Sequence, residues 1–229
     1  MISALVTDFY ELTMMQGYFL QHHNPRVVFD MFYRTNPFNG GYTIFTGLEE
    51  LVTILENFRF SEEDINYLRS LGKFQESFLE YLASYRFTGD LYAFDEGTPA
   101  FPQEPLIRVE TNMLDAQLIE SVLLNTINFQ TLIATKASRM KLATKSHGSI
   151  MEFGLRRAQG MDGALSASRA CYIGGADVTS NTLAGKEFGI PVAGTMAHSW
   201  IMLFSDEYEA FRAFADIYPD NCILLIDTY

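Results

Sequence analysis

The sequence predicts an α/β protein in two parts: an N-terminal α+β sandwich-like domain over residues 1–112, then an incomplete α/β barrel over residues 113–229. Three observations predict this. Strand-like and helix-like segments come in clusters over the first hundred or so residues. From residue 148 onward, short apolar strands alternate strictly with helices, which is typical of a parallel sheet or barrel. With 229 residues, 48% of them hydrophobic, the chain can bury a large core.

The first part begins with a helix predicted over residues 8–21, where Asp8 and Glu11 have the spacing of a capping box. "VVFDMFYR" is rich in β-branched and aromatic residues and predicts a strand, with "TNPFNGG" as the following turn. "YTIFTG" is expected to be a second strand that pairs with the first. Two amphipathic helices follow, "LEELVTILENF" and "SEEDINYLRSLG", the second begun by Ser61 and ended by Gly72. "RFTGDLYAFDEGT" and "PLIRVET" return to β character.

The second part opens with a long helical stretch over residues 114–144, predicted as two helices that break near Asn125–Asn128. Alternation then begins, with strands at "SIMEFG", "IPVAG" and "CILLID", a short strand or loop at "IGGADV", and helices over residues 163–172, 180–188 and around 211–217. In such folds the loops at the carboxyl ends of the strands carry the chemistry. The candidate segments are therefore "GLRRAQG", "GGADVTSN", "GTMAHSW" and "DTY".

Charge narrows the class of ligand. The chain has 16 Lys and Arg against 28 Asp and Glu, a net charge of -12, which argues against a nucleic-acid partner. Residues 131–170 nevertheless hold seven basic and two acidic side chains. This segment is either a solvated helix face or the wall of a pocket for a small anion.

Cysteine usage and hydropathy bear on the compartment. Cys171 and Cys222 have neither CxxC nor metal-ligand spacing, which fits a reducing cytosol. No apolar run reaches membrane-spanning length, and the N-terminal residues lack a signal-peptide pattern. We expect a cytoplasmic protein without a membrane partner.

Histidine and glycine-rich segments supply further candidates. His198 follows the strand "IPVAG" and is either a structural histidine bound to a backbone carbonyl, a general base, or a nucleophile toward a phosphoryl group. His22, His23 and His147 are interpreted as structural. In "GGADVTSN" the glycines allow close approach of a ligand, Asp177 follows them, and Thr179 and Ser180 stand where a helix begins. A plain helix cap is a compatible interpretation, and no nucleotide-binding motif is present.

The arginines of "EFGLRRAQG" suit an anionic ligand. Adjacent side chains that leave a strand point in different directions, so one arginine of this pair is expected to face the pocket. A guanidinium fork is a natural partner for a carboxylate or phosphate, and Phe153 offers a face to a flat ring. The alternative is a surface arginine pair beside a core phenylalanine. Arg34, after "VVFDMFY", is either a second anion ligand or an exposed strand-end residue.

These motifs together resemble nicotinate phosphoribosyltransferases. The likeness runs in order through "TDFYELTM", "FTGLEE", "FRFSEEDINYLRS", "FTGD", "INFQTLIATKA", "EFGLRRAQG", "GADVTSNTLAGKEFGIPVAGTMAHSW" and "YPDNCILLIDTY", nearly the whole chain. The resemblance implies a type II phosphoribosyltransferase fold and a reaction of nicotinate with 5-phosphoribosyl-1-pyrophosphate (PRPP), giving nicotinate mononucleotide and pyrophosphate in NAD salvage. It also implies ATP hydrolysis through a phosphohistidine, Mg²⁺ as cofactor, and a homodimer that shares its active sites.

The same resemblance implies a role for individual residues. Phe153 would stack on the pyridine ring, with Tyr10 of the partner subunit on the other face. Arg156 would meet the nicotinate carboxylate or a neighbouring phosphate, and Arg34, also in trans, would hold phosphate. Asp177 would orient the ring or the ribose. Thr179 is a further candidate at the loop, and His198 would be the phosphorylated histidine with Ser199 beside it.

Length is the main departure from the family, whose chains are about twice as long. We therefore expect the sequence to be the first part of a longer protein and to be inactive alone. The alternatives are a nicotinamide or quinolinate phosphoribosyltransferase with the same fold, or a non-catalytic truncated remnant.

Overall fold

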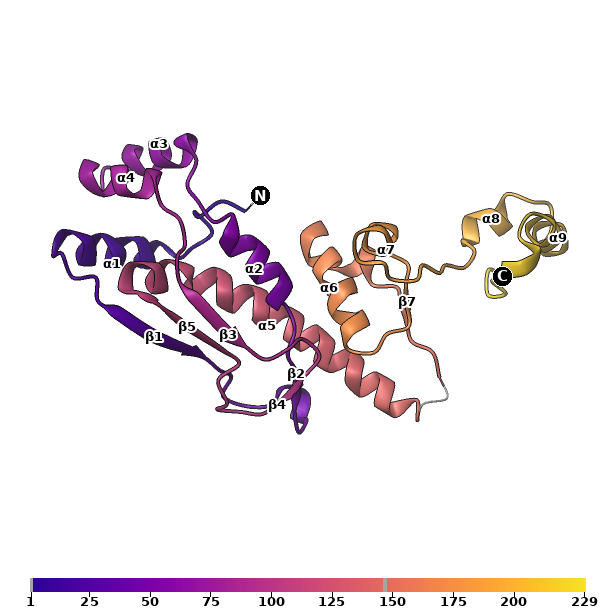
Figure 1. Cartoon of the computed structure of the whole chain (residues 1–229). Coiled ribbons are helices and arrows are strands. Elements are labelled where there is room, and N and C mark those ends of the chain that lie inside the picture. Colours follow the sequence, from indigo (N-terminus) through magenta and orange to yellow (C-terminus); the bar gives the residue numbers. More distant parts are fainter. Residues whose placement is uncertain (1, 146–147) are drawn as a thin grey trace.

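The computed structural model describes residues 2–145 and 148–229, so His147 lies outside the described residues. The helices are α1 (Phe9–Leu20), α2 (Leu48–Glu56), α3 (Glu62–Ser70), α4 (Glu76–Ala83), α5 (Met113–Ala143), α6 (Met161–Ile173), α7 (Thr182–Phe188), α8 (His198–Met202) and α9 (Glu207–Ile217). The strands are β1 (Arg26–Met31), β2 (Thr43–Ile44), β3 (Asp90–Ala93), β4 (Pro99–Ala100), β5 (Ile107–Asn112), β6 (Met151–Glu152) and β7 (Val178–Thr179). The molecule is elongated, with α1–α4 and their sheet at one end and α8–α9 at the other (Figure 1).

The N-terminal sheet has the antiparallel order β1-β5-β3, with Val28 opposite Glu110 and Leu91 opposite Val109. Alternate residues of β5 are buried, as expected for a strand with one face on a core. The predicted pairing of "YTIFTG" with the first strand is wrong, because β2 pairs with β4 instead. Helix α5 holds β2 in place, since the amide of Ile44 donates to Thr135 Oγ1 over 2.9 Å.

Helix α5 is one continuous helix of 31 residues, so the predicted break near Asn125–Asn128 is wrong. Asn and Thr have modest helix propensity, but Thr126 and Ile127 are buried, and this tertiary packing outweighs the local preference. The helix packs against α1, α2 and the sheet near its start and against α6 further along (Figure 1). Because α5 contacts both parts of the chain, the boundary at residue 112 stays a prediction.

Helix caps were predicted with mixed success. Ser61 begins α3 and Gly72 follows that helix with φ +62°, as predicted. Ser61 also forms a capping box with Asp64, which was not predicted. The box expected at Asp8 is absent, because the Asp8 carboxylate accepts a hydrogen bond from Ser121 of α5 at 2.8 Å instead. Helix α4 was not predicted.

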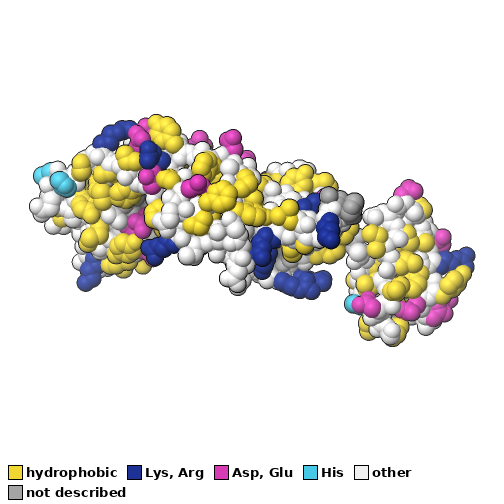
Figure 2. All heavy atoms as spheres, turned by 90° about the horizontal axis from the view of Figure 1, so that it is seen from below, with side chains coloured by type: hydrophobic (Ala, Val, Ile, Leu, Met, Phe, Trp, Pro, Cys, Tyr) yellow, Lys and Arg dark blue, Asp and Glu magenta, His cyan; other side chains and the backbone are white. Residues whose placement is uncertain are grey.

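The main core lies between α1–α5 and the sheet, and its largest fully buried side chains include Phe45, Phe58 and Phe78. A second, small cluster around Ile201 holds α8 and α9 together. Figure 2 shows the lobe that contains these two helices standing apart, with hydrophobic side chains on its surface. Among the exposed ones are Leu203 (79%) and Ile226 (77%), so this lobe is incompletely packed.

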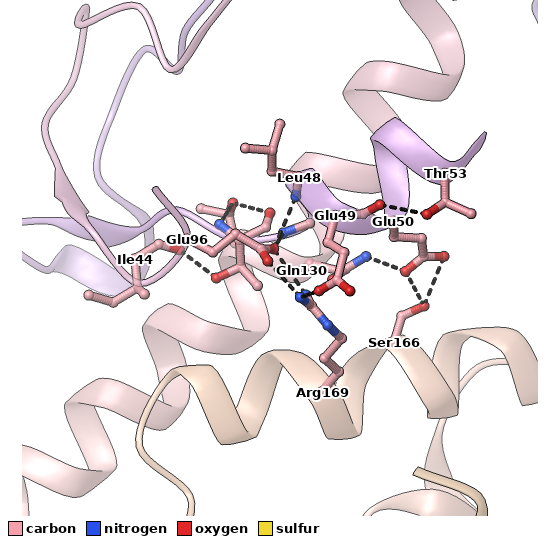
Figure 3. Close-up of polar contacts among 12 residues, drawn as sticks. Ile44, Leu48, Glu49, Glu50, Thr53, Glu96, Gln130, Ser166 and Arg169 are labelled. Atoms are coloured by element: carbon pink, nitrogen blue, oxygen red, sulfur yellow. Dashed lines mark hydrogen bonds and ion pairs between the residues drawn. The ribbon is translucent and has the colours of Figure 1, made fainter. Parts of the chain in front are cut away.

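A polar cluster joins the N-terminal layer to α6 (Figure 3). Arg169 of α6 is 11% exposed and forms ion pairs with Glu49 of α2 and with Glu96, the latter at 2.6 Å. Glu96 also accepts the amide of Leu48 at 3.0 Å, at the start of α2. Beside this group, Glu50 accepts hydrogen bonds from Gln130 of α5 and Ser166 of α6. The cluster therefore fixes α6 against both α2 and α5.

The alternating second part is confirmed in outline. β6 and β7 pair in parallel, and Thr179 forms a parallel bridge to Val192, so "IPVAG" contributes a single bridging residue. Residues 222–227, predicted as a strand, form none, since a strand needs a neighbour and no paired strand flanks this segment among the described residues. Across residues 2–145 and 148–229, no helix combines the length and hydropathy needed to cross a membrane.

Candidate functional site

The carboxyl ends of three parallel segments meet at one place, as the parallel-sheet rule predicts. Met151 pairs with Val178 and Glu152 with Thr179, and Thr179 bridges Val192 on its other side. The chain after each segment then turns toward the same space. A cavity of about 520 Å³ opens there. It is lined by Phe153, Leu155, Arg156, Ser180, Gly194, Thr195, Met196, Ala197, His198 and Leu225.

Phe153 and Arg156 reach this cavity from the segment after β6. The ring of Phe153 is half-buried, and Arg156 is exposed on the short 3-10 helix Leu155–Arg157. Within residues 2–145 and 148–229 the Arg156 guanidinium has no hydrogen-bond or ion-pair partner in the protein. Arg157 does not line the cavity. The neighbouring arginines are thus divided as the sequence suggests, with one free fork beside an aromatic face.

His198 reaches the cavity as the first residue of α8. Its Nδ1 lies 3.1 Å from the Thr228 hydroxyl, and its Nε2 lies 3.9 Å from Asp227 Oδ1. Sequence reasoning placed "DTY" at a strand end without giving either residue a role. The available signal was the position of this tripeptide after the apolar run "CILLI", at the same edge as "GTMAHSW".

Three other candidates near these loops differ in placement. Thr179 is 1% exposed, and its hydroxyl donates to Glu152 Oε2 at 2.6 Å, so it faces the interior. Ser180, not Thr179, lines the cavity. Ser199 is exposed and outside the lining, although it follows His198 directly.

Comparison with known proteins decides the family. The family model described as the nicotinate phosphoribosyltransferase (NAPRTase) N-terminal domain matches residues 5–128, more than half of the chain. This chain belongs to the nicotinate phosphoribosyltransferase family. The nicotinate phosphoribosyltransferase pncB2 of Mycobacterium tuberculosis is 45% identical over 228 residues, which cover 100% of this chain and 49% of that protein. The nicotinate phosphoribosyltransferase of Bacillus subtilis is 45% identical over 227 residues, which cover 99% of this chain and 46% of that protein.

Solved structures agree with this assignment. The crystal structure of human nicotinic acid phosphoribosyltransferase has a TM-score of 0.81 at 39% identity and covers 87% of this chain and 41% of that one. A nicotinate-nucleotide pyrophosphorylase from Pyrococcus furiosus has a TM-score of 0.76 at 26% identity, over 96% of this chain and 48% of that one. The mixed α/β fold is therefore confirmed as that of type II phosphoribosyltransferases. The chain spans about half the length of the curated relatives that it matches.

Asp177, the family's expected ring- or ribose-orienting residue, is engaged elsewhere. It precedes β7, and Lys141 Nζ at the end of α5 lies 2.7 Å from both carboxylate oxygens. The amide of Ile150 also donates to Oδ2 at 2.7 Å. The hydrogen bonds from Lys141 and then from Ile150 hold the pKa of Asp177 below its usual value. The structure does not bring this carboxylate to the cavity and shows it tying α5 to the parallel strands.

Tyr10 and Arg34 lie on the N-terminal layer, away from the cavity lining. The Tyr10 ring is 52% exposed on α1, and its hydrogen bond with Glu11, with a contribution from burial, raises the pKa of Tyr10 to about 12. It is therefore a neutral phenol at physiological pH. Arg34 is exposed just after β1. Both were predicted to serve a partner subunit's site, and that role stays a prediction.

The described residues contain no cluster of side chains suited to bind a metal ion. In the described part of the chain, no group of three or more His, Cys, Asp or Glu side chains has a geometry that could hold a metal ion. Asp227, whose carboxylate lies 3.9 Å from His198 Nε2, is 75% exposed and belongs to no such group. These residues do not fit a resident magnesium site.

Proposed function

We propose that this chain is part of a nicotinate phosphoribosyltransferase, which joins nicotinate to PRPP and releases pyrophosphate with the formation of nicotinate mononucleotide. The observation that carries the proposal is the cavity in which Phe153, Arg156 and His198 meet. The 45% identity to nicotinate phosphoribosyltransferases of two bacteria supports the same substrates.

The cavity suits a flat, anionic base. The free guanidinium of Arg156 can donate two parallel hydrogen bonds to the pyridine carboxylate or to a phosphate of PRPP. Phe153 offers its ring to the pyridine, and the partner's Tyr10 would cover the other face. Loss of pyrophosphate leaves positive charge on the ribose, so the base must be held in line with the breaking bond. Binding and orientation are what these residues supply.

His198 is proposed as the residue that takes a phosphoryl group from ATP. One imidazole nitrogen bonds to the γ-phosphorus, the bond to ADP breaks, and water later releases phosphate. The contact between Nδ1 and Thr228 orients the ring, and Ser199, the next residue along the chain, is proposed to contact the transferred group. The chemistry of His198 thus couples ATP hydrolysis to the ribosyl transfer.

Magnesium and assembly complete the proposal. We assign Mg²⁺ to the substrate as a complex with the pyrophosphate of PRPP, because the described residues lack a cluster of their own for it. A homodimer is proposed because Tyr10 and Arg34 do not reach the cavity of their own chain. The two unpaired cysteines, partly exposed, fit a cytoplasmic protein.

A substrate comparison tests the proposal. The full-length protein is incubated with PRPP, Mg²⁺ and one of nicotinate, nicotinamide or quinolinate, with and without ATP, and the mononucleotide is quantified by chromatography. We expect product from nicotinate, and more of it with ATP. Preference for nicotinamide or quinolinate would overturn the base assignment. A full-length protein that makes no product and is not stabilised by PRPP would instead be a non-catalytic remnant.

A further inference from the structure

Glu152 stands directly before Phe153 but does not line the cavity. Its carboxylate instead collects hydrogen bonds from three elements. Oε2 accepts from Thr179 of β7 at 2.6 Å and from Ser168 of α6 at 2.9 Å. Oε1 accepts from the amide of Gly154, and the main-chain oxygen of Glu152 accepts the amide of Ser180 at 2.9 Å.

The donors around this carboxylate are themselves fixed. Ser168 is 2% exposed, and its hydroxyl accepts a hydrogen bond from the side-chain Nδ2 of Asn181 at 3.1 Å. The hydroxyl of Thr179 accepts a hydrogen bond from the main-chain amide of Asn181 at 3.0 Å. Asn181 in turn caps α7 through the amide of Ala184. Both hydroxyls accept a hydrogen bond from Asn181, and the Thr179 hydroxyl donates to Glu152. The single hydrogen of the Ser168 hydroxyl is shared between Glu152 and the main-chain oxygen of Ala164, at 3.0 Å. An ionised carboxylate, which only accepts, is the group that completes this pattern.

Gly154 shows how closely the backbone approaches the carboxylate. A Cβ at this position would lie 2.8 Å from Glu152 Oε1, nearer than a real Cβ comes to another heavy atom. The φ of Gly154 is −87°, which any residue can adopt, so a larger residue here would displace the end of the Glu152 side chain without straining the backbone. The side chain of Glu152 therefore binds the main chain at Gly154, which follows Phe153 and stands two residues before Arg156.

We propose that Glu152 is a positioning residue, whose carboxylate sets the path of residues 153–156 and so the placement of the ring-stacking Phe153 and the anion-binding Arg156. The inference rests on the proposed function of this cavity. Glu152 is not a catalytic residue, because both of its oxygens are directed at protein donors. Its negative charge is held by neutral donors rather than by a cation among the described residues.

The substitution Glu152→Gln tests this role in the full-length protein. The amide NH₂ would place a donor where the wild type has an acceptor, facing either the hydroxyls of Ser168 and Thr179 or the amide of Gly154. Glu50→Gln is the matched control, because Glu50 also bonds a serine of α6, Ser166, but lies outside the cavity. We expect Glu152→Gln to raise KM for nicotinate about tenfold or more while KM for PRPP changes less than threefold. Glu50→Gln should leave both constants within twofold of the wild type.

Amide hydrogen exchange of residues 152–157, followed by mass spectrometry without substrates, provides the second readout. Exchange should be about tenfold faster in Glu152→Gln than in Glu50→Gln. Equal exchange in the two variants, or an unchanged KM for nicotinate despite faster exchange, would overturn the positioning role. The exchange measurement needs no catalysis. A wild-type protein inactive toward nicotinate would thus refute the proposed function. The amide exchange rates of residues 152–157 would then still test whether Glu152 positions this segment.

Discussion

At the scale of single residues, the two neighbouring arginines after β6 have different surroundings. Arg156 lines the cavity and makes no protein ion pair within the described residues, whereas Arg157 points elsewhere. The Arg156 guanidinium is exposed to solvent in a cavity that Phe153 also lines, so it is available to a ligand anion. This asymmetry is the basis for the first prediction.

Arg156→Lys keeps the charge but loses the planar fork, so one of two parallel hydrogen bonds to a carboxylate disappears. We expect KM for nicotinate to rise about tenfold, equivalent to about 1.4 kcal/mol. Steady-state kinetics of the full-length protein measure it, with Arg157→Lys as the matched control that should stay within about twofold. An unchanged KM in Arg156→Lys would remove the carboxylate role from this residue.

The second residue prediction concerns His198. His198→Ala removes the only imidazole among the described residues that line the cavity, and it should abolish ³²P labelling of the protein from γ-labelled ATP. His22→Ala, at the exposed end of α1, serves as control and should label normally. The labelled protein is detected after alkaline gel separation, which preserves phosphohistidine. Labelling that persists in His198→Ala would identify another acceptor.

Sequence reasoning found Phe153, Arg156 and His198 because a general rule places strand-end loops around one site. It did not foresee the partner of Asp177, since Lys141 is 36 residues away and only the fold brings the two side chains together. Asp227 and Thr228 were missed as individual residues for the same reason. Spacing along the chain can predict which edge a residue occupies, but it cannot predict which neighbour a side chain contacts.

At the scale of elements, Arg169 is a largely buried cation that helps to attach α6 to the N-terminal layer. Arg169 meets Glu96, which also accepts the amides of Gly47 and Leu48 (Figure 3). Burial alone would raise the pKa of Glu96, but the hydrogen bonds from Arg169 and then from Gly47 outweigh it and lower the pKa. A carboxylate with a lowered pKa stabilises the fold above its unfolded pKa, and that contribution fades as the pH falls through the folded value.

Glu96→Gln should therefore destabilise the protein at pH 7 and flatten its loss of stability in acid. We expect a decrease in the free energy of unfolding of about 2 kcal/mol, below the figure for a fully buried pair because Glu49 still reaches Arg169. Urea unfolding at a series of pH values from 7 to well below 4 measures both effects, because the folded pKa of Glu96 lies below its usual value of 4.5. A variant whose stability falls as steeply as the wild type's in acid would show that Glu96 does not cause the acid sensitivity.

Glycine contacts between α5 and α6 give a second element prediction. A Cβ at Gly174 would meet the main-chain oxygen of Ala134 at 2.3 Å, whereas one at Gly163 would meet only Phe129 Cζ at 3.9 Å. Gly174→Ala should lower the free energy of unfolding by about 1–3 kcal/mol through overpacking. Gly163→Ala, in the first turn of α6, should change it by less than about 1 kcal/mol and in the stabilising direction. Thermal unfolding of both variants would test this, and equal effects would contradict the close packing of these helices.

The errors in predicting elements share one physical cause. The break expected in α5 followed from local propensity, and the pairing expected for β2 followed from sequence proximity. In both places tertiary contacts decide: buried Thr126 and Ile127 keep α5 continuous, and Thr135 of α5 holds β2. The segment 222–227 has the composition of a strand but no paired neighbour in the described chain, and composition alone cannot supply one.

At the scale of the whole molecule, the two ends of the chain differ in how much hydrophobic core they bury, and the cavity has few cationic side chains. The N-terminal layer has a large buried core, whereas the lobe of α8 and α9 has a small one. This lobe exposes Met202, Leu203 and Tyr208. The proposed reaction would need more cationic groups than the cavity shows, since PRPP carries a 5′-phosphate and a pyrophosphate, and nicotinate carries a carboxylate. Arg156 is the single arginine or lysine in the lining described here.

Residues 1–229, produced alone, are therefore expected to form no nicotinate mononucleotide. The chain spans about half of its relatives' length, and we propose that further barrel strands and a partner's Tyr10 and Arg34 complete the site. The measurement is product formation by this polypeptide and by the full-length protein at equal concentration. Because an inactive polypeptide could simply be misfolded, circular dichroism and hydrogen exchange of α5 must show the folded N-terminal layer. Turnover by residues 1–229 at a rate comparable to the full-length protein would show that the missing charges are not needed, and would refute the proposal that the site is shared.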